Sequence, residues 1–565
     1  MKIKEYIPLL ENLSDYSKTT FREDATAGLT VSILLIPQGM AYAFLAGMPP
    51  IYGLYGGLIP LFLYGLLGSS RQLSIGPVAI SALLVLAGIS ELAEPGSDHY
   101  IQLVITTGLL IGIVQIILGL LRMGFLVNFL SHPVVAGFTS AAAVIIALSQ
   151  LKDLLGFPIP RFQYSYETVL YAVEYIDQSN WITILLCFSS IAFILALRRI
   201  NKKLPGALIV VLLGTIISWL LNLENRGVSI IRDIPKGLPG FMVPELSFET
   251  IISLMPTVFT VTIIGIVESI GIAKVLESRH QDHEVRPNQE LLALGFSKLG
   301  GAFFQSLPTS GSFTRSAINS AAGAKSGMAS IVAAVFVMLT LIFLTPLFYF
   351  LPKAILAAII LLAVRSLFDY REAIYLWQTH RRDFVMMLVT FVFTLALGIE
   401  EGVLVGVILS VLAVLYRSSR PHVAILGKLP GTTYYRNIDR FEEAEQLEDV
   451  IIMRFDNQLY FGNAAYFKDV IRALVKDNEP KIKYFFLDAK SMYDIDSSGL
   501  RALHEVYRYL SQRGVQLYIS GAIGPVRDML HKSGLLDEIG KDHHFMYLND
   551  AIEDYKVRKS TETGL

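Results

Sequence analysis

The sequence has little cysteine and little charge for its length. Of its 565 residues one is cysteine, Cys187, so neither a disulfide framework nor a cysteine-based zinc site can form within the chain. The ten histidines form no HExxH pattern, and no Walker A sequence is present, which argues against a metalloenzyme or an ATP-driven machine. Charged residues make up 17% and the formal net charge is −1, so nucleic acid is not an expected partner. We expect no enzyme activity, no cofactor and no metal.

Apolar residues, in contrast, are abundant. A hydrophobic share of 53% and a mean hydropathy of +0.53 are typical of a multi-span protein embedded in a lipid bilayer. A bilayer-crossing helix needs about 20 mostly apolar residues, and hydropathy predicts about fourteen such segments. They start near Ala27, Tyr52, Gly76, Ile101, Pro133, Trp181, Pro205, Leu254, Gln289, Thr314, Ser330, Ala354, Phe384 and Gly402. Those after Gly76 and Thr314 are too short to cross alone, and paired discontinuous helices mark binding sites in transporters.

Loop charges predict the orientation of these segments. Basic residues such as Arg71, Arg122 and Arg381 lie in every second connection, whereas the acidic stretches ELAEPGSDHY and GIEEG lie in the others. Because basic loops stay on the cytoplasmic side, we expect both termini to be cytoplasmic, in a plasma or inner membrane.

The composition changes after Arg420 and Pro421. VIIMRFDNQLYF, KYFFLDAK and QLYISG are rich in β-branched and aromatic residues and predict strands. AAYFKDVIRALVKD and SGLRALHEVYRYLSQRG have helical apolar spacing. Alternation of the two predicts a small α/β domain. We expect a cytoplasmic N-terminal segment at 1–24, a transmembrane domain at 25–420, a linker at 421–433, the α/β domain at 434–555 and a disordered tail at 556–565.

One polar segment inside the hydrophobic part, SLPTSGSFTRSAINS from Ser306 to Ser320, carries Arg315. An arginine inside a membrane is costly and is a functional-site hypothesis by default. A helix start with free N–H groups beside a guanidinium suits an anion. The alternative is a loop arginine that reaches the interface. QLSIGPVAISALL has a similar Ser/Gly helix start, and an odd number of spans between the two would make them an inverted pair facing one cavity. The alternative there is a pair of ordinary helix kinks.

Two further sets of polar residues lie in apolar segments. Glu268 is flanked by apolar residues in TVTIIGIVESIGIAKVLES. An ionised carboxylate there is costly, so it should either take up a proton, as in a proton relay, or pair with a cation such as Arg315. Gln38 and Tyr42 lie one turn apart, next to Pro37, and could line the same cavity. Helix–helix hydrogen bonding is the alternative for both.

Asp496, Ser497, Ser498 and Gly499 follow a predicted strand and open a helix. Helix capping by Asp or Ser explains this pattern, and it is the interpretation we favour. The alternative is a phosphorylation or phosphate-contact point, because a helix start attracts phosphate.

Four ordered stretches resemble one family. DATAGLTVSILLIPQGMAYAFLAGMPPIYGLY resembles the first spans of the sulfate permease family (SulP; solute carrier 26 in animals). SIGPVA resembles its third-helix start, TSGSFTRSAIN its tenth-helix start, and IDSSGL the central motif of the STAS domain that ends these proteins. The resemblance covers nearly the whole chain.

The resemblance implies a fourteen-span helical fold of two inverted seven-span repeats, arranged as core and gate domains, with a cytoplasmic α/β STAS domain. It implies an elevator-like secondary transporter that forms homodimers. Ser498 matches the serine phosphorylated in related antagonists of anti-sigma factors. Glu268 matches the carboxylate of proton-coupled sulfate members. The residues implied to line the anion site are Gln38, Tyr42, Ser74, Gly76, Pro77, Val78, Ala79, Ser312, Phe313, Thr314 and Arg315.

The combination of Glu268 and Arg315 favours sulfate moved with protons. Bicarbonate importers of the family carry aspartate at the position of Glu268 and use sodium. The alternatives are sodium-coupled bicarbonate transport, dicarboxylate transport, a nucleobase carrier of similar fold, and an anion channel or sensor. The partner of the STAS domain is not predicted.

Overall fold

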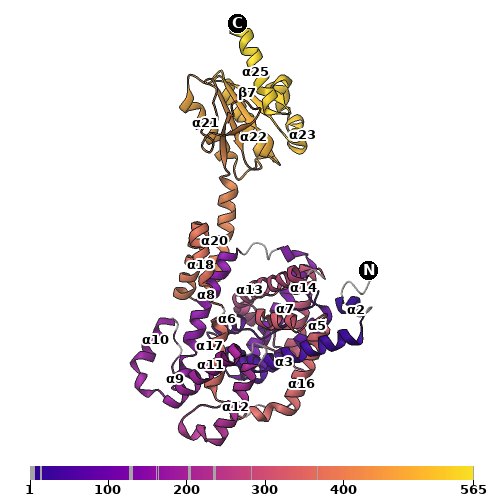
Figure 1. Cartoon of the computed structure of the whole chain (residues 1–565), viewed down its shortest axis with the longest axis vertical. Helices are drawn as coiled ribbons and strands as arrows, with labels where there is room; N and C mark the ends of the chain where they lie inside the picture. The colour runs from indigo at the N-terminus through magenta and orange to yellow at the C-terminus, as the bar shows by residue number, and fades with distance from the viewer. Residues whose placement is uncertain are drawn as a thin grey trace. The chain divides into compact units, whose positions relative to one another are not determined.

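The structure is a computed structural model of the chain. It describes residues 7–12, 16–125, 131–160, 162, 165–200, 205–232, 237–280, 283–365 and 367–563. The chain divides into two compact units, Met1–Ser410 and Val411–Leu565, which are described separately (Figure 1).

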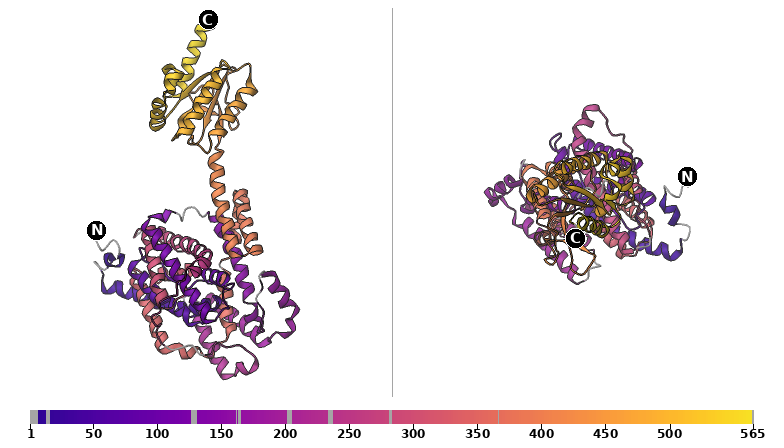
Figure 2. Two further views of the ribbon diagram at one scale, coloured as in Figure 1. Left: turned by 180° about the vertical axis from the view of Figure 1, so that it is seen from behind. Right: turned by 90° about the horizontal axis from the view of Figure 1, so that it is seen from above.

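The first unit is built almost entirely of helices (Figures 1 and 2). Among the described residues, five apolar helical stretches are long enough to cross a membrane by length and composition: Lys18–Leu45, Asp98–Leu120, His132–Leu155, Phe248–Ser278 and Met328–Phe348. The α-helices are α2 (Pro8–Asn12), α3 (Lys18–Leu45), α4 (Ile51–Gly56), α5 (Ile59–Leu67), α6 (Ala79–Ile89), α7 (Asp98–Leu120), α8 (His132–Ser149), α9 (Leu151–Leu155), α10 (Ser165–Glu174), α11 (Trp181–Ile200), α12 (Gly206–Leu220), α13 (Phe248–His280), α14 (Pro287–Phe303), α15 (Phe313–Ala321), α16 (Met328–Leu339), α17 (Lys353–Val364), α18 (Tyr370–Thr379), α19 (Arg381–Leu397) and α20 (Ile399–Ser419), the last of which continues into the second unit.

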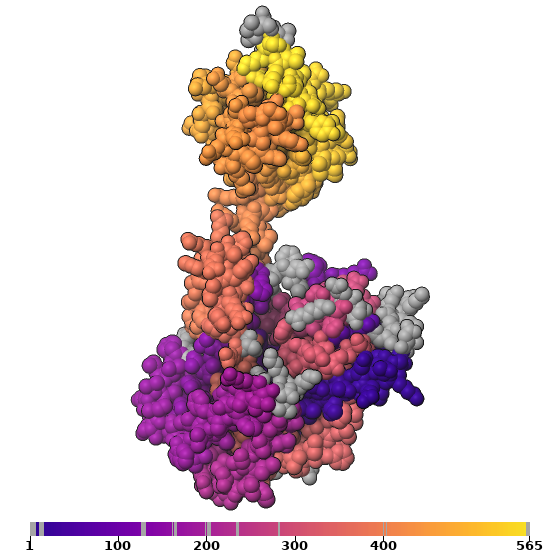
Figure 3. Space-filling view, in the orientation of Figure 1, coloured from indigo at the N-terminus to yellow at the C-terminus, as the bar shows by residue number. Residues whose placement is uncertain are grey.

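The predicted apolar segments all coincide with helices. Each predicted start lies on a helix or, for Gly76 and Pro205, just before one, at α6 and α12. Figure 3 shows one face of the surface of this unit. Many large apolar side chains of the unit are exposed, among them Trp219, Phe248 and Phe343, as expected of a surface that faces lipid. That all fourteen segments cross a membrane stays a prediction.

The two helices predicted to be too short are indeed short, and they begin side by side. Strand β1 (Ile75–Gly76) precedes α6, and strand β2 (Ser310–Gly311) precedes α15. The strands pair antiparallel, with Ile75 opposite Gly311 and Gly76 opposite Ser310. The structure therefore joins two half-length helices, more than two hundred residues apart in sequence, at their N-terminal ends.

Helix pairing in the first unit follows a reciprocal pattern. Helix α7 packs on α14 and α5 packs on α16; likewise, α6 packs on α13 and α3 packs on α15. If α3, α5, α6 and α7 correspond in order to α13, α14, α15 and α16, exchanging the two halves turns each of these pairs into the other. This pattern supports the predicted repeat.

The second unit is a six-stranded sheet with helices on both faces (Figure 2). The strand order is β4-β3-β5-β6-β7-β8, in which β5 to β8 run parallel and β3 is antiparallel to both neighbours. The elements are β3 (Val423–Lys428), β4 (Tyr435–Asn437), β5 (Val450–Phe455), α21 (Ala464–Asn478), β6 (Tyr484–Asp488), α22 (Ser497–Ser511), β7 (Gln516–Ser520), α23 (Gly524–Lys532), α24 (Leu535–Ile539), β8 (His544–Phe545) and α25 (Leu548–Thr563). The three predicted strands and two predicted helices are confirmed.

Two boundaries differ from the sequence prediction. The predicted linker at 421–433 contains β3, which pairs with β4 and β5 and has Ala424 and Leu426 buried against the sheet. The predicted disordered tail at 556–565 is helical as far as Thr563, in α25. Lys559 fastens this helix, because its Nζ lies 2.8 Å from Asp449 Oδ2 and 2.9 Å from the Tyr555 hydroxyl. Burial opposes ionisation of Asp449, but the hydrogen bonds from Lys559 and Tyr555 hold its pKa below the ordinary value.

Candidate functional site

Arg315 lies in the first turn of α15 and is fully buried. Its Nη1 donates to the carbonyl oxygen of Pro77 at 3.0 Å and to Gln38 Oε1 at 3.4 Å, so the guanidinium bridges α15, the β1–α6 turn and α3. The Nε and Nη2 atoms are inaccessible to solvent and have no hydrogen-bond partner within the described residues. Buried donors are rarely left unpaired, so two N–H groups on one edge of this cation remain to hold a ligand.

The β1–β2 pair fixes this arginine in place. The Ser312 N–H donates to Ser74 O at 3.0 Å, and the Ser74 N–H donates to Ser316 Oγ at 2.9 Å. Gly76 has a φ of +153°, and a Cβ at that position would lie 3.1 Å from Arg315 Nη2 and 3.0 Å from Leu35 Cδ1. Only glycine therefore fits this backbone conformation next to the guanidinium.

Two helix N-termini converge on the same place. Helix α6 begins after Val78, which is extended and makes no side-chain cap, and α15 begins after Ser312, whose Oγ accepts from the Arg315 N–H at 3.4 Å. The first N–H groups of each helix have no partner inside the helix. The positive ends of two helix dipoles add to the charge of Arg315, and this combination favours an anion.

Glu268 is on α13, beside this arrangement. Its side chain is partly buried, and its Oε2 has no hydrogen-bond partner in the described part of the chain. It lies close enough to Arg315 and Tyr42 to interact electrostatically with both, yet no Glu268–Arg315 salt bridge within 4.0 Å occurs among the described residues. The next residue, Ser269, accepts the Gly311 N–H at 2.8 Å and so anchors α13 to β2. The Glu268 carboxylate therefore lies near the Arg315 guanidinium without forming a salt bridge to it.

Most of the predicted site residues come together here. Gln38 and Tyr42 are buried on α3, and Ser74, Gly76, Pro77, Val78 and Ala79 are buried at the start of α6. Gln38 accepts a hydrogen bond from Arg315. This contact agrees both with the predicted cavity lining and with the alternative, a hydrogen bond between helices. Ser312 is half-buried, whereas the side chains of Phe313 and Thr314 are exposed. The backbone of the last two belongs to the first turn of α15, so their N–H groups are the parts that could serve an anion.

Sequence reasoning did not identify several residues that build the site. Ser316 accepts the N–H of Ser74, just before β1, Ser269 accepts the N–H of Gly311 in β2, and Asn319 Nδ2 donates to Gln72 O at 3.0 Å. For Ser316 and Asn319, a signal was present in the sequence: together with Ser312 they are spaced so that all three lie on one face of α15.

Two buried carboxylates hold the loops that flank the short helices. Asp24 accepts from the N–H and Oγ of Ser326 at 3.1 and 2.6 Å, after α15. Glu290 accepts from the N–H and Oγ of Ser69, both at 2.7 Å, and from the Tyr64 hydroxyl at 2.7 Å, before β1. Their charges are satisfied locally, so they act as structural anchors.

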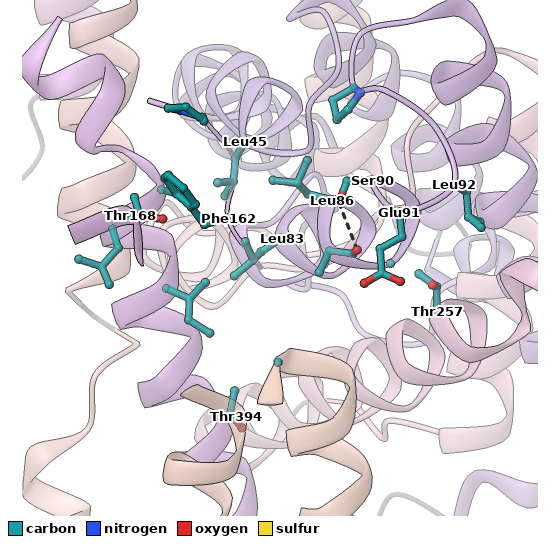
Figure 4. Close-up of a pocket in the computed structure, with 18 of the residues that line it drawn as sticks. Leu45, Leu83, Leu86, Ser90, Glu91, Leu92, Phe162, Thr168, Thr257 and Thr394 are labelled. Atoms are coloured by element: carbon teal, nitrogen blue, oxygen red, sulfur yellow. Dashed lines mark hydrogen bonds between the residues drawn. The ribbon is translucent and has the colours of Figure 1, made fainter. Parts of the chain in front are cut away.

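A cavity of about 1120 Å³ lies elsewhere in the first unit (Figure 4). It is lined by the C-terminal parts of α3, α6, α8 and α19 and by the N-terminal part of α13, through residues such as Leu45, Leu86, Thr257 and Thr394. No predicted site residue lines it. Helix α6 begins at the Arg315 region and lines the cavity with its C-terminal part, and α13 lines the cavity near its N-terminus and reaches the Arg315 region near its middle, at Glu268 and Ser269.

In the second unit, Asp496 is the N-cap of α22. Its Oδ1 accepts the Gly499 N–H at 2.7 Å and its Oδ2 accepts the Phe461 N–H at 3.0 Å. The capping interpretation is confirmed. Ser497 is exposed and Ser498 is partly exposed, and their modification stays a prediction.

Comparison with known proteins places this arrangement in a family. The model of the sulfate permease family matches residues 21–390, and that of the STAS domain matches residues 442–551. The chain belongs to the sulfate permease family.

Full-length relatives support this membership. The chain is 40% identical to the probable sulfate transporter 4.2 of Arabidopsis thaliana, over 94% of this chain and 81% of the relative. It is 35% identical to the high affinity sulfate transporter 2 of Stylosanthes hamata, over 98% of this chain and 86% of the relative.

Two solved structures share the fold. Murine solute carrier 26 family member A9, described as an anion transporter in the inward-facing state, matches with a TM-score of 0.90 at 26% identity, over 98% of this chain and 94% of that one. The transmembrane domain of the cyanobacterial bicarbonate transporter BicA matches with a TM-score of 0.61 at 22% identity, over 70% of this chain and 98% of that one. The predicted fold class, a helical membrane domain followed by an α/β STAS domain, is thereby confirmed, and the chain is a member of a family of integral membrane transporters.

Proposed function

We propose that this chain is a secondary active transporter that takes up sulfate together with protons. The observation that carries the proposal is Arg315: a buried guanidinium with two unpaired donors at the meeting point of two helix N-termini. A divalent oxyanion is fully ionised and accepts hydrogen bonds without donating any, which matches a site made of N–H and hydroxyl donors. The relatives named as sulfate transporters support this choice of anion.

Glu268 is the proposed proton carrier. It lies near Arg315, where we propose that the anion binds, and it has an unpaired oxygen, so a negative charge there repels sulfate and a proton there removes the repulsion. Sulfate and a proton therefore bind with positive coupling, and each raises the affinity for the other.

Transport requires that the site open alternately to the two sides. We propose that α3, α6, α13 and α15, which are joined through Arg315, β1 and β2, move as one body carrying the anion, in an elevator-like cycle. We further propose fourteen spans with both termini cytoplasmic in a plasma or inner membrane, a homodimer, and a STAS domain that binds a cytoplasmic regulator. Loop charges and the family's architecture support these parts.

The test is radiolabelled sulfate uptake into proteoliposomes of the purified full chain, with and without an inward proton gradient, in sodium-free and sodium-containing buffers. Accumulation that follows the proton gradient and ignores sodium supports the proposal. Stimulation by sodium with competition by bicarbonate would assign the chain to bicarbonate, and competition by fumarate would assign it to dicarboxylates. Ion conductance that does not saturate would indicate a channel.

A further inference from the structure

Helix α18 lies on the surface of the first unit and is attached to it by one face. Leu376 is the buried residue of this helix and packs in a small apolar cluster with residues of α8 and α19. The Asp369 carboxylate caps the helix start by accepting the Glu372 N–H at 3.0 Å. Glu372 Oε1 lies 3.2 Å from His132 Nδ1 of α8. These contacts fix the position of α18 and leave its other face exposed.

The exposed face of α18 is apolar and aromatic. Tyr370, Ile374 and Trp377 are spaced four and three residues apart, so they lie on one face of the helix, and each is more than half exposed. The Trp377 ring contacts the Phe384 ring of α19 edge-on, at 5.0 Å between centres. Beyond Phe384, α19 exposes Val385 and other apolar residues along a segment predicted to cross the membrane. The apolar face of α18 is thus continuous with a surface expected to face lipid.

Three exposed arginines border this apolar face. The Cζ atom of Arg371 lies 5.9 Å from the centre of the Tyr370 ring, and that of Arg381 lies 5.4 Å from the centre of the Trp377 ring. Arg382 follows directly. In the part of the chain that the structure describes, none of the three guanidinium groups lies within 4.0 Å of a carboxylate oxygen. Their charges are therefore available to an anionic partner.

The position of two of these arginines does not favour the helix that carries them. Arg381 and Arg382 lie in the first turn of α19, where the positive end of the helix dipole opposes a positive charge. Asp383 in the same turn is half-buried and offsets part of this repulsion. An anion outside the helix, next to the two exposed guanidinium groups, would interact favourably with both arginines and with the helix dipole.

The net charge of the whole segment is positive. Residues 365–383 contain four arginines and three carboxylates. All four arginines are exposed, whereas Glu372 and Asp383 are half-buried and Asp369 is engaged as the helix cap. Arginines therefore outnumber carboxylates on the exposed side of α18.

Helix α10 provides a comparison within the same chain. In the predicted repeat, the connection between the fifth and sixth spans, which contains α10, corresponds to the connection between the twelfth and thirteenth, which contains α18. Helix α10 also exposes apolar side chains, among them Leu170 and Val173. Its segment, residues 156–180, contains one arginine and three carboxylates, so its net charge has the opposite sign.

The two segments are also predicted to lie on opposite sides of the membrane. Figure 1 shows α18 in the upper part of the first unit and α10 in the lower part. Loop charges predict that the α18 segment is cytoplasmic and the α10 segment is not. An exposed apolar face is thus common to both helices, and positive charge accompanies it only on the predicted cytoplasmic side, where membranes carry anionic lipids.

We propose that α18 lies in the plane of the cytoplasmic membrane surface, where Arg371, Arg381 and Arg382 bind the headgroups of anionic phospholipids. The apolar face around Trp377 then contacts the acyl chains, as in other interfacial helices with aromatic and basic residues. This inference rests on the membrane orientation given under the proposed function. A second copy of the chain or another protein on the same face would instead exclude lipid from it.

Trp377 makes the proposal measurable, because the chain has only three tryptophans, at 181, 219 and 377. Replacing Trp181 and Trp219 by Phe leaves Trp377 as the only tryptophan of the full chain. This protein is placed in phosphatidylcholine nanodiscs that contain a small fraction of either brominated phosphatidylglycerol or brominated phosphatidylcholine. Bromine on the acyl chains quenches a tryptophan on contact, so the quenching reports which lipid lies against α18.

We expect brominated phosphatidylglycerol to quench Trp377 more strongly, equivalent to at least about fivefold tighter binding, since one arginine near an anionic surface contributes about that factor. The preference should weaken in about 1 M salt, where exposed charges are screened within about 3 Å. Replacing Arg371, Arg381 and Arg382 together by Gln should abolish the preference and leave Trp377 quenched equally by both lipids. Thermal unfolding shows whether each variant is folded.

Trp181 provides the matched control. It lies at the start of α11, directly after the α10 segment, and is 70% exposed. A chain with Trp181 as its only tryptophan should show no preference for the anionic lipid in the same nanodiscs.

Three results would overturn the inference. One is equal quenching of Trp377 by the two lipids, another is quenching by neither, which would show that protein covers this face, and the third is a preference that survives loss of the three arginines. The measurement requires no transport. A chain that takes up no sulfate would therefore contradict the proposed function without changing the quenching result.

Discussion

Arg315 and Glu268 lie on two different helices, α15 and α13, and have different proposed roles. Arg315 has two acceptors and two unpaired donor atoms, so we propose that it holds an anion, whereas Glu268 has an unpaired oxygen nearby whose negative charge would repel one. The opposite signs of these two groups make distinct predictions for their substitution.

Arg315→Ala should weaken sulfate binding by about thirtyfold or more, because removing a partner from a buried, charge-assisted contact costs about 2 kcal/mol at least. Arg315→Lys should restore part of the affinity, since a compact ammonium lacks the planar fork of donors. Calorimetric titration of the purified variants with sulfate checks both. Sulfate transport by the Arg315→Ala variant at the wild-type rate would contradict the assignment of Arg315 to the anion site.

Glu268→Gln resembles the protonated state and should uncouple transport from pH. Exchange of sulfate for sulfate should persist, while accumulation driven by a proton gradient should be lost. Counterflow and gradient-driven uptake in the same proteoliposomes measure the two separately. If accumulation by this variant still follows the proton gradient, the proton is carried elsewhere.

Arg315 and Glu268 could be found in the sequence because a charge inside an apolar segment is itself informative. The sequence did not predict that Lys298 of α14 is buried, because SKLGG is equally typical of the polar end of a span. Only the packing of α14 against α7 shows that this lysine is buried. The roles of Ser316 and Ser269 were not predicted, because hydroxyl groups in membrane helices usually form hydrogen bonds to the backbone of their own helix.

The β1–β2 pair is the element on which the site depends, because it joins the starts of α6 and α15. Helix positions could be predicted from hydropathy, but strands of two residues have no periodicity to reveal them. Strand β3 lies in the segment predicted as a linker, because the composition changes after Arg420 and Pro421 and the α/β pattern is recognisable in the sequence only from about Tyr434.

Gly76→Ala tests this element. The new Cβ would press on Arg315 Nη2 and Leu35 and would strain a backbone at φ +153°, so sulfate affinity should fall together with stability. Gly323→Ala is the matched control, because it also has a positive φ, +94°, but has nothing within 4 Å of the added Cβ. Thermal unfolding should show both variants destabilised by about 1–3 kcal/mol, and titration should show weaker sulfate binding in Gly76→Ala alone. Equal sulfate affinities in the two variants would contradict the proposed contact.

The residues of the proposed anion site all lie in the first unit, Met1–Ser410, and the sheet of the second unit begins at Val423. The family could be identified from four sequence motifs spread over the chain, whereas the start of the sheet in the second unit, at Val423, is shown by the strand pairing of β3.

Truncation after Arg420 should therefore leave sulfate affinity unchanged. Truncation also removes the hydrogen bond from the Tyr460 hydroxyl to Ser418 Oγ, which connects the STAS domain to the end of α20. We therefore expect lower transport or poorer assembly. Titration and uptake with the truncated, detergent-purified protein measure these two effects. A folded truncation that binds no sulfate would contradict this division of labour.

The central claim is that sulfate and a proton bind together at Arg315 and Glu268. The most direct measurement is the sulfate affinity of the purified full chain between about pH 8 and about pH 6, a range that buried carboxylates can reach, with and without sodium. Protonation of Glu268 removes the negative charge nearest the anion, so affinity should rise as the pH falls, and this rise should disappear in Glu268→Gln. A flat profile, or an affinity that rises with sodium and not with protons, would contradict the account.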